Sequence, residues 1–517
     1  MVLSVTHNMH RQVGQTFSGI PGRSFSIPYF YDGIQLSGDP FFLECAEDKN
    51  FKHMDECSDL QICARANSTH HDVIVGKLPH RHVVLTDSLA GVIEGFLAGD
   101  CNVILFESLP EHFIQEWGYE GEYKTGNAFY SKEPLGLETV KDDPRWSDFL
   151  RVMVQALLVA EQANITQATA HLMPQTMVFG DDYQDCFRHA VAAVGNYAEM
   201  WSQHFEGTSI HRRSINHINN GSTGLLYAHP LGTLNPPDAA LVESLGPTME
   251  RILQRGTLLC GVRLERPGFA NGTITDNDDD DDVVAGMEVD LCKAIAASLF
   301  EGDMKAVELV ELASPEDAFV QLANHQVDVI AGATWNLVND VLEPTTGLGF
   351  AFSQPYFYGY SDQEDNLCLA TMQDDHNWMS FVYWINTAMV YAEELNITRQ
   401  TSNLMPEIYV YGSALRRMLR DALLVGNYGE IYKQNVEPII PRAGRNQFTI
   451  PSITSCPGSF EGLSARSCPA LLCFLSGLLG KRFRRMGSFS CEMANTRPLK
   501  WRTMATEWKP MHAKTRK

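Results

Sequence analysis

The sequence predicts an α/β fold that contains an internal duplication. Residues 142–174 and 374–406 align without a gap and are identical at 14 of 33 positions, including Trp146 and Trp378. Chance does not produce a match of this length, so the chain contains a repeat. Strand and helix patterns also alternate between residues 247 and 331, which is typical of a parallel α/β layer.

The strands and helices are clearest in the second half of the chain. A short helix precedes a strand at residues 257–262, and the apolar spacing over residues 286–300 predicts a helix. A β-run at residues 305–313 follows, then a helix with Ser314 as N-cap and Pro315 at its first position, then a buried strand at residues 327–331. Ligands of such layers bind at the carboxyl ends of strands, which here carry Phe269 and the turn of residues 333–340.

Composition narrows the class of function. The chain has 517 residues, 44% of them hydrophobic and 20% charged, which is typical of two to four globular domains. Its net charge of −23 argues against a nucleic-acid or anionic-membrane partner. The longest apolar run, residues 469–480, is too short for a membrane span. Residues 449–517 stand apart, because they carry a net charge of +9.

The cysteines and glycosylation sequons indicate an oxidising, extracytoplasmic compartment. Twelve dispersed cysteines form no CxxC pair, so no zinc ribbon or redox motif is predicted. Five sequons begin at Asn67, Asn164, Asn220, Asn271 and Asn396. Residues 1–22, in contrast, lack the apolar region of a signal peptide.

Neither metal nor cofactor chemistry is predicted. The cluster His70, His71, His80 and His82 has no acidic or cysteine partners at ligand spacing. The acidic stretch of residues 276–282 lacks the glycine and glutamate of a calcium-binding EF-hand loop. We find no nucleophile elbow, phosphate-binding loop or HExxH motif, so no catalytic residue is assigned.

Several motifs in the second half resemble one protein family. "RGTLLCGV", "GMEVDLCKAIAASL", "QVDVIAGATWNLVND" and "FSQPYFYGY" are similar to the extracellular solute-binding proteins of family 3. These are two-lobed receptors for polar amino acids in ABC uptake systems. "AEELNIT" and "VGNYGEIYKQNV" resemble the general L-amino-acid-binding subgroup, and the match spans most of residues 25–448. The resemblance implies a periplasmic-binding-protein-like type II clamshell, an extracytoplasmic location and a membrane permease as partner.

The family plan also implies tandem copies that each lack one lobe. From Pro355 to Asp374 the second copy has only 19 residues, whereas the first copy has 114 between Pro28 and Asp142. About 95 residues, the size of lobe 2, are therefore absent from the second copy. The first copy lacks the beginning of lobe 1. Trp378 should therefore be buried in a lobe 1 core, and Trp146 only where the first copy finds a substitute partner.

The resulting domain plan has six parts. They are an unstructured N-terminus (1–24), hinge and lobe 2 of the first copy (25–132), the C-terminal part of its lobe 1 (133–235), the N-terminal part (245–360) and C-terminal part (361–448) of lobe 1 of the second copy, and a disordered basic tail (449–517).

The family's ligand-binding positions can be carried over residue by residue. Glu107 aligns with the acid that binds the ligand's ammonium group, and Asn67, Ser68 and Thr69 match a polar turn that donates hydrogen bonds. The competing interpretations are an exposed loop acid for Glu107, and an N-cap or a glycan site for the turn.

The second copy departs from the family at the position that binds the ligand's carboxylate. Asn339 stands where the family has arginine, and an asparagine cannot form the charge-assisted pair with a carboxylate. Thr334 could still hold a neutral polar ligand. Phe269 and Trp335 either stack on a ligand or pack in the core.

Two cysteine pairs are candidate disulfides. Cys63 and Cys101 lie at the ends of neighbouring lobe 2 elements, and Cys260 and Cys292 do the same in lobe 1; free buried thiols are the alternative.

The preferred interpretation is a non-enzymatic receptor that closes two lobes on a small polar ligand such as an amino acid. One alternative is a non-binding cell-surface or lumenal scaffold of the same fold. Another is an enzyme like the cyclic-acid dehydratases of this fold. The bisected repeats and the basic tail also fit an incompletely assembled gene product.

Overall fold

The structure is a computed structural model, and its described residues all belong to one compact unit, Met1–Phe460. The described residues are 2–13, 22–49, 57–66, 68, 70–71, 82–107, 111–131, 133–141, 143–207, 212, 245–274, 283–335, 337–341, 347–357 and 367–442. The predicted basic tail therefore lies outside them.

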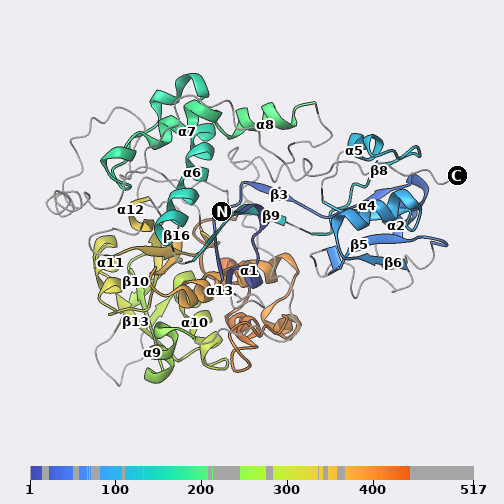
Figure 1. The fold of residues 1–517 in the computed structure, drawn as a ribbon. Helices are drawn as coiled ribbons and strands as arrows, with labels where there is room; N and C mark the ends of the chain where they lie inside the picture. The colour runs from blue at the N-terminus through green and yellow to red at the C-terminus, as the bar shows by residue number, and fades with distance from the viewer. Residues whose placement is uncertain are drawn as a thin grey trace. The chain divides into compact units, whose positions relative to one another are not determined.

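Both halves of the chain contain strands and helices, and each half ends in a run of helices (Figure 1). The first half contains β1 (Val2–Thr6), α1 (Met9–Val13), β2 (Arg23–Phe25), β3 (Phe30–Asp32), β4 (Gln35–Gly38), α2 (Pro40–Lys49), β5 (Ile62–Arg65), β6 (Val83–Thr86), α4 (Leu89–Ala98), β7 (Val103–Phe106), α5 (Glu111–Glu116), β8 (Lys124–Thr125), β9 (Glu133–Val140), α6 (Pro144–Gln162), η3 (Gln167–Leu172), η4 (Asp181–Tyr183), α7 (Cys186–Val194) and α8 (Tyr197–Phe205). The second half contains α9 (Pro247–Arg255), β10 (Leu258–Val262), β11 (Asn271–Thr273), β12 (Val283–Ala285), α10 (Met287–Leu299), β13 (Val307–Glu311), α11 (Pro315–Ala323), β14 (Val329–Thr334), α12 (Leu337–Asp340), β15 (Phe350–Phe352), β16 (Leu367–Met372), α13 (His376–Glu394), η6 (Arg399–Leu404), α14 (Met418–Ala422), η7 (Leu423–Val425) and α15 (Tyr428–Asn435).

Two five-stranded sheets share one plan. One has the order β6-β5-β7-β4-β8 and the other β13-β10-β14-β16-β15. In each, three parallel strands are followed by an antiparallel fourth strand, which is β4 in the first sheet and β16 in the second. We call these sheets, with their helices, lobe 2 and lobe 1.

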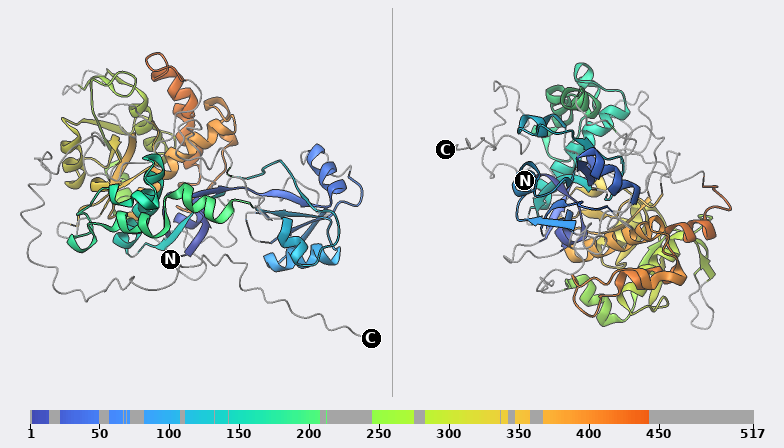
Figure 2. Two further views of the ribbon diagram at one scale, coloured as in Figure 1. Left: turned by 90° about the horizontal axis from the view of Figure 1, so that it is seen from above. Right: turned by 90° about the vertical axis from the view of Figure 1, so that its right-hand side faces the viewer.

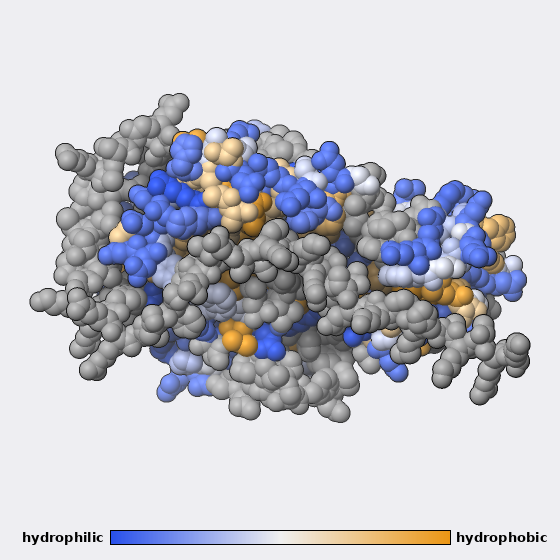
Figure 3. Space-filling view, turned by 45° about the horizontal axis from the view of Figure 1, so that its top comes forward, coloured by the Kyte–Doolittle hydropathy of each residue, from blue (hydrophilic) through white to orange (hydrophobic). Residues whose placement is uncertain are grey.

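Each sheet is buried on both faces, as the alternation of its side chains requires. In lobe 2, Val103 and Leu105 of β7 share a cluster with residues of α2, while Ile104 between them shares another cluster with residues of α4. The helices of lobe 2 lie on both sides of its sheet (Figure 2). Lobe 1 likewise has a large cluster around α10 and α13 and a smaller one around α11. On the face shown in Figure 3, hydrophilic residues predominate over the described surface. None of the described helices is both long and apolar enough to cross a membrane.

A third, four-stranded sheet corrects the prediction that residues 1–24 are unstructured. β1 pairs with β9 on one side, and β2 and β3 pair with β9 as well. β9 supplies backbone partners for β1, and the side chains of Met9 and Val13 in α1 are buried. The spacing of these two residues places both on one helical face, a signal that is short and therefore easy to overlook.

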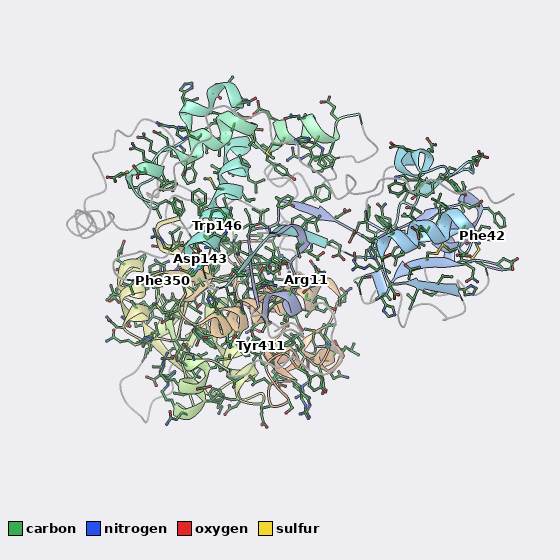
Figure 4. The ribbon with its side chains drawn as sticks, viewed as in Figure 1. Arg11, Phe42, Asp143, Trp146, Phe350 and Tyr411 are labelled. Carbon is green, nitrogen blue, oxygen red and sulfur yellow. A yellow bond between two sulfur atoms is a disulfide. The ribbon has the colours of Figure 1, made fainter. Side chains whose placement is uncertain are left out.

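The repeated segment forms equivalent helices in different surroundings. Asp143 caps α6 and Asp375 caps α13, each by accepting from the tryptophan amide three residues on. Trp378 is 1% exposed and donates to the Asp328 carbonyl, whereas Trp146 is 43% exposed (Figure 4). The expectation for Trp378 is confirmed. Trp146 has no such enclosure among the described residues.

Among the described residues, three disulfides lie within the lobes. Cys63–Cys101 and Cys260–Cys292 confirm the two predicted pairs. A third, Cys45–Cys57, was not predicted.

Candidate ligand-binding site

Two predicted lobe 2 residues lie where neighbouring parallel strands end. Ser68 lies just beyond β5 and Glu107 directly follows β7, and these strands pair in parallel. Because the carboxyl ends of parallel strands meet at one edge of a sheet, both residues lie at that edge. The Ser68 hydroxyl donates to the Arg65 carbonyl over 2.6 Å. Asn67 and Thr69 lie outside the described residues.

His70 connects Ser68 with Glu107. Its ring nitrogen Nδ1 lies 3.4 Å from the Ser68 hydroxyl, and Nε2 lies 3.7 Å from the Glu107 carboxyl. The ring is buried and stacks on Phe106 with centroids 5.9 Å apart. Burial lowers the pKa of His70 to about 4, and repulsion from Arg65 acts in the same direction. His70 is therefore neutral near pH 7.

Glu107 lies among charged groups. Its pKa is raised to about 8, and burial is the largest cause. Repulsion from Glu133 and Asp32 adds to the rise, while attraction to Arg11 and Arg65 opposes it. The side chain is 31% exposed. Glu107 is therefore largely protonated at neutral pH until a positive charge approaches it.

Glu133 and Asp32 come from the paired strands β9 and β3. They are direct partners in the ladder, and Asp32 accepts a hydrogen bond from the Gly33 amide at 2.8 Å. Glu133 is 1% exposed, and burial raises its pKa. Hydrogen bonds from Thr6 and Ser131 and attraction to Arg11 oppose that rise. The N-terminal segment thus reaches the same group of acids.

The strand pairing identifies the place of this segment in the repeat. Thr6 of β1 pairs with Leu135 of β9, and Thr334 of β14 pairs with Leu367 of β16. Leu135 and Leu367 are 232 residues apart, which is the spacing of the repeat. Both ladders have an irregularity just before the threonine. Counting on from each threonine, Arg11 is the counterpart of Asn339.

The side chains repeat this correspondence. Arg11 Nη1 donates to the Thr6 carbonyl over 2.8 Å, and Asn339 Nδ2 donates to the Thr334 carbonyl over 3.3 Å. The arginine that the second copy lacks is therefore present in the first copy, on α1 (Figure 4). We call residues 6–13 the Arg11 turn and residues 334–341 the Asn339 turn.

The aromatic residues of the two turns also correspond. His7 Nε2 lies 2.7 Å from Gln12 Oε1, where the second copy has a bond between Trp335 and Asp340. His7 stacks on Phe25 with ring centroids 4.4 Å apart, and Trp335 stacks on Phe352 at 6.2 Å.

The predicted residues of the second copy are not gathered at Glu107. Thr334, Trp335 and Asn339 are half-buried in the Asn339 turn. Phe269 is buried in the lobe 1 core, edge-to-face against Phe357 and below the Arg266 guanidinium. It packs as a core residue.

The sequence prediction missed Arg11, Asp32, Glu133 and the contact of His70. The signal for Arg11 was the shared pattern of threonine, asparagine and valine in "VTHNMHRQV" and "ATWNLVNDV". It has few identities, and the family resemblance covered the chain only from residue 25.

No family model matches the chain. It is 30% identical over 114 residues to the amino-acid ABC transporter-binding protein YhdW of Escherichia coli (strain K12), a match that covers 22% of this chain. It is 30% identical over 112 residues, 22% of this chain, to the general L-amino acid-binding periplasmic protein AapJ of Rhizobium johnstonii. The chain spans about 30% of the length of these curated relatives.

Solved structures show a similar partial match. An ABC transporter periplasmic binding protein from Brucella ovis with glutathione bound is 20% identical, with a TM-score of 0.32 over 40% of this chain and 69% of that chain. A lysine-bound ABC transporter binding component from Wolinella succinogenes is 14% identical, with a TM-score of 0.25 over 39% of this chain and 68% of that chain.

The sequence matches are to an amino-acid ABC transporter-binding protein and a periplasmic amino-acid-binding protein, and each match covers 22% of this chain. The two five-stranded sheets share one plan, which fits tandem, incomplete copies of one α/β unit.

Proposed function

We propose that this chain is a solute-binding protein whose first copy binds a small ligand that carries an amino and a carboxylate group. The observation that supports this is the placement of Arg11 at the turn where the second copy has Asn339. A guanidinium forms paired, charge-assisted hydrogen bonds with a carboxylate, which an asparagine amide cannot match.

Glu107 is the proposed partner of the amino group. A ligand ammonium beside it would favour the ionised carboxylate and lower its raised pKa. Arg11 attracts Glu107 electrostatically, and in this proposal the two groups hold the two ends of one zwitterion. Ser68, with Asn67 and Thr69, supplies further hydrogen-bonding groups in this proposal.

The second copy has a different proposed role. Asn339 replaces the arginine, and Phe269 is committed to the core. These observations favour a non-binding scaffold for the second copy, which was the alternative for the whole chain. We assign no catalytic role, since a binding protein needs none, and turnover of a cyclic acid would contradict this.

The proposed setting is extracytoplasmic, with a membrane permease as partner. Three disulfides support an oxidising compartment. The two named relatives are an ABC transporter-binding and a periplasmic protein.

The test is ligand-induced stabilisation of the full chain by each of the twenty L-amino acids. A ligand at 100 times its Kd should raise the free energy of unfolding by about 2.7 kcal/mol. R11M should weaken binding by about 1.5–3 kcal/mol through loss of the charge-assisted pair. R188M is the matched control, because Arg188 pairs with Asp185 on α7. Absence of stabilisation by all twenty would overturn the proposal.

A further inference from the structure

The Arg11 turn does not pack on its own copy alone. Met9 and Val13 of α1 are buried in the large lobe 1 cluster of the second copy, together with Trp384 and Ile385 of α13. The His7 ring lies 5.6 Å from the Tyr383 ring and meets Trp384 edge-on at 5.9 Å.

The Asn339 turn packs in the reverse sense. Leu337 and Val341 are buried in a cluster formed by α6 and α7 of the first copy, which includes Val152. Asp340 forms an ion pair with Arg151 of α6 at 2.8 Å, and both side chains are largely buried.

These two sets of contacts are the same contact made twice. Met9 corresponds to Leu337 and Val13 to Val341. His7 faces two residues of α13, Tyr383 and Trp384. At the repeat spacing of 232 residues, these two correspond to Arg151 and Val152 of α6. Each turn therefore lies against the same part of the other copy's helix, as in an isologous interface between two subunits.

A further bond lies near this interface. Gln373, which follows β16, donates to both oxygens of Asp148 in α6 at 2.9 and 3.0 Å. Lys141, its counterpart after β9, is attracted to Asp375 at the start of α13. In each copy, the residue that follows β9 or β16 therefore interacts with a residue in or next to the other copy's helix.

The second copy supplies the apolar cluster in which Met9 and Val13 of α1 are buried. A helix of five residues has no stability of its own in water. In the part of the chain that the structure describes, the sheet of β9 contains three further strands, and Trp146 is exposed. Met9 and Val13 lie on one face of α1, which fixes the helix against α13 and turns Arg11, two residues from each, off that face.

We propose that the second copy is the scaffold of the first, and that a pseudo-symmetric interface between the Arg11 turn and α13, and between the Asn339 turn and α6, holds Arg11 in place. The interface itself stands without the proposed function, whereas its consequence for ligand binding rests on it. Arg11 would contact the ligand, and Met9 and Val13 act as positioning residues.

The first experiment measures the interface without a ligand. In the full chain labelled with 5-fluorotryptophan, H7A and M9A should each shift the ¹⁹F resonance of Trp384, assigned with W384F. The exposed Trp146 should not respond, and L337A, the matched change in the other turn, should leave Trp384 unmoved. An unmoved Trp384 resonance in both H7A and M9A would overturn the proposal.

The second experiment tests the reciprocal contact. R151M, D340N and the double variant form a double-mutant cycle on unfolding of the full chain. If the two effects were additive, the single variants would predict the unfolding equilibrium constant of the double variant. The measured constant should be at least fivefold smaller than that prediction, which means that the double variant is more stable than expected. Additive effects would show that the Asn339 turn does not lie on α6.

The third experiment addresses positioning. With L-glutamine, L-glutamate and L-lysine as probes, M9A should weaken binding at least fivefold at a temperature where it is folded, and M9L should restore it. If the parent chain binds none of the three probes, the other L-amino acids take their place, and absence of binding to all twenty overturns the proposed function, while the first two experiments still decide the interface. Binding unchanged in M9A would remove the positioning role.

Discussion

At the scale of single residues, the ionisable groups near Glu107 form an unusual set. Three carboxyls, those of Asp32, Glu107 and Glu133, are near each other, with Arg11 and Arg65 as the positive groups that act on Glu107. Two of the three have raised pKa values because of burial. In the absence of a ligand, these two carboxyl groups keep their protons at pH values above 4.5, where the unfolded chain would release them.

This arrangement predicts a dependence of stability on pH. The pKa of Glu107 is about 8 in the folded chain against an ordinary value of 4.5. Between these values the folded state binds more protons than the unfolded state, so the free energy of unfolding falls as pH rises from 4.5 to 8. E107Q should remove this decline in the free energy of unfolding. At pH 8 the variant should be more stable than the parent chain by about 1 kcal/mol or more, since each pKa unit corresponds to about 1.36 kcal/mol. Urea unfolding of both proteins at pH 5 and pH 8 measures the difference.

The control is E138Q. Glu138 also lies on β9, but it forms an ion pair with Arg23 of β2 and is not among the acids that act on Glu107. A slope of stability with pH that is the same in E107Q as in the parent chain would contradict the assignment.

At the scale of elements, one sequence segment serves in two environments. The helices α6 and α13 begin with the same aspartate cap and share a tryptophan in the first turn. What differs is the sheet beneath them, which has five strands under α13 and fewer under α6. Equivalent residues therefore contribute unequally to stability.

A matched pair of substitutions tests this difference. W378A removes a fully buried indole and its hydrogen bond to Asp328, so it should cost about 3–5 kcal/mol. W146A removes a side chain that is 43% exposed and stacked on Phe149, and should cost about 1 kcal/mol or less. Chemical unfolding of both variants measures the two costs, and equal costs would contradict the structure.

At the scale of the whole molecule, lobe 2 and lobe 1 have separate cores. The clusters on either face of the lobe 2 sheet contain only residues between 34 and 130. The clusters of the lobe 1 sheet contain residues of the second copy together with Met9 and Val13 of α1. Damage to one lobe should therefore leave the other folded.

Hydrogen exchange can resolve this. L60A creates a cavity in lobe 2 and should cost about 2–5 kcal/mol there. Amides in β5 and β7 should lose protection, while amides in β10 and α10 keep theirs. Equal loss of protection in both lobes would show that they unfold as one cooperative unit.

The sequence by itself determined the features that depend on local pattern and on chain order. The strand and helix spacing of the second copy and the Ser314 cap followed from short-range periodicity. The burial of Trp378 followed from the plan of the family that the motifs resemble, and the two disulfides were candidates that the structure confirms. The domain boundaries, apart from the corrected N-terminus, and the ligand-binding role remain predictions.

Only the tertiary structure decided what the N-terminal residues do. β1 and α1 are five residues each, too short for periodicity to reveal and too weak to persist alone. Their strand partner, β9, lies more than 120 residues along the chain, and the core that buries Met9 belongs to the second copy. The sequence by itself did not identify Arg11 as a site residue, because pairing and burial between distant segments place it.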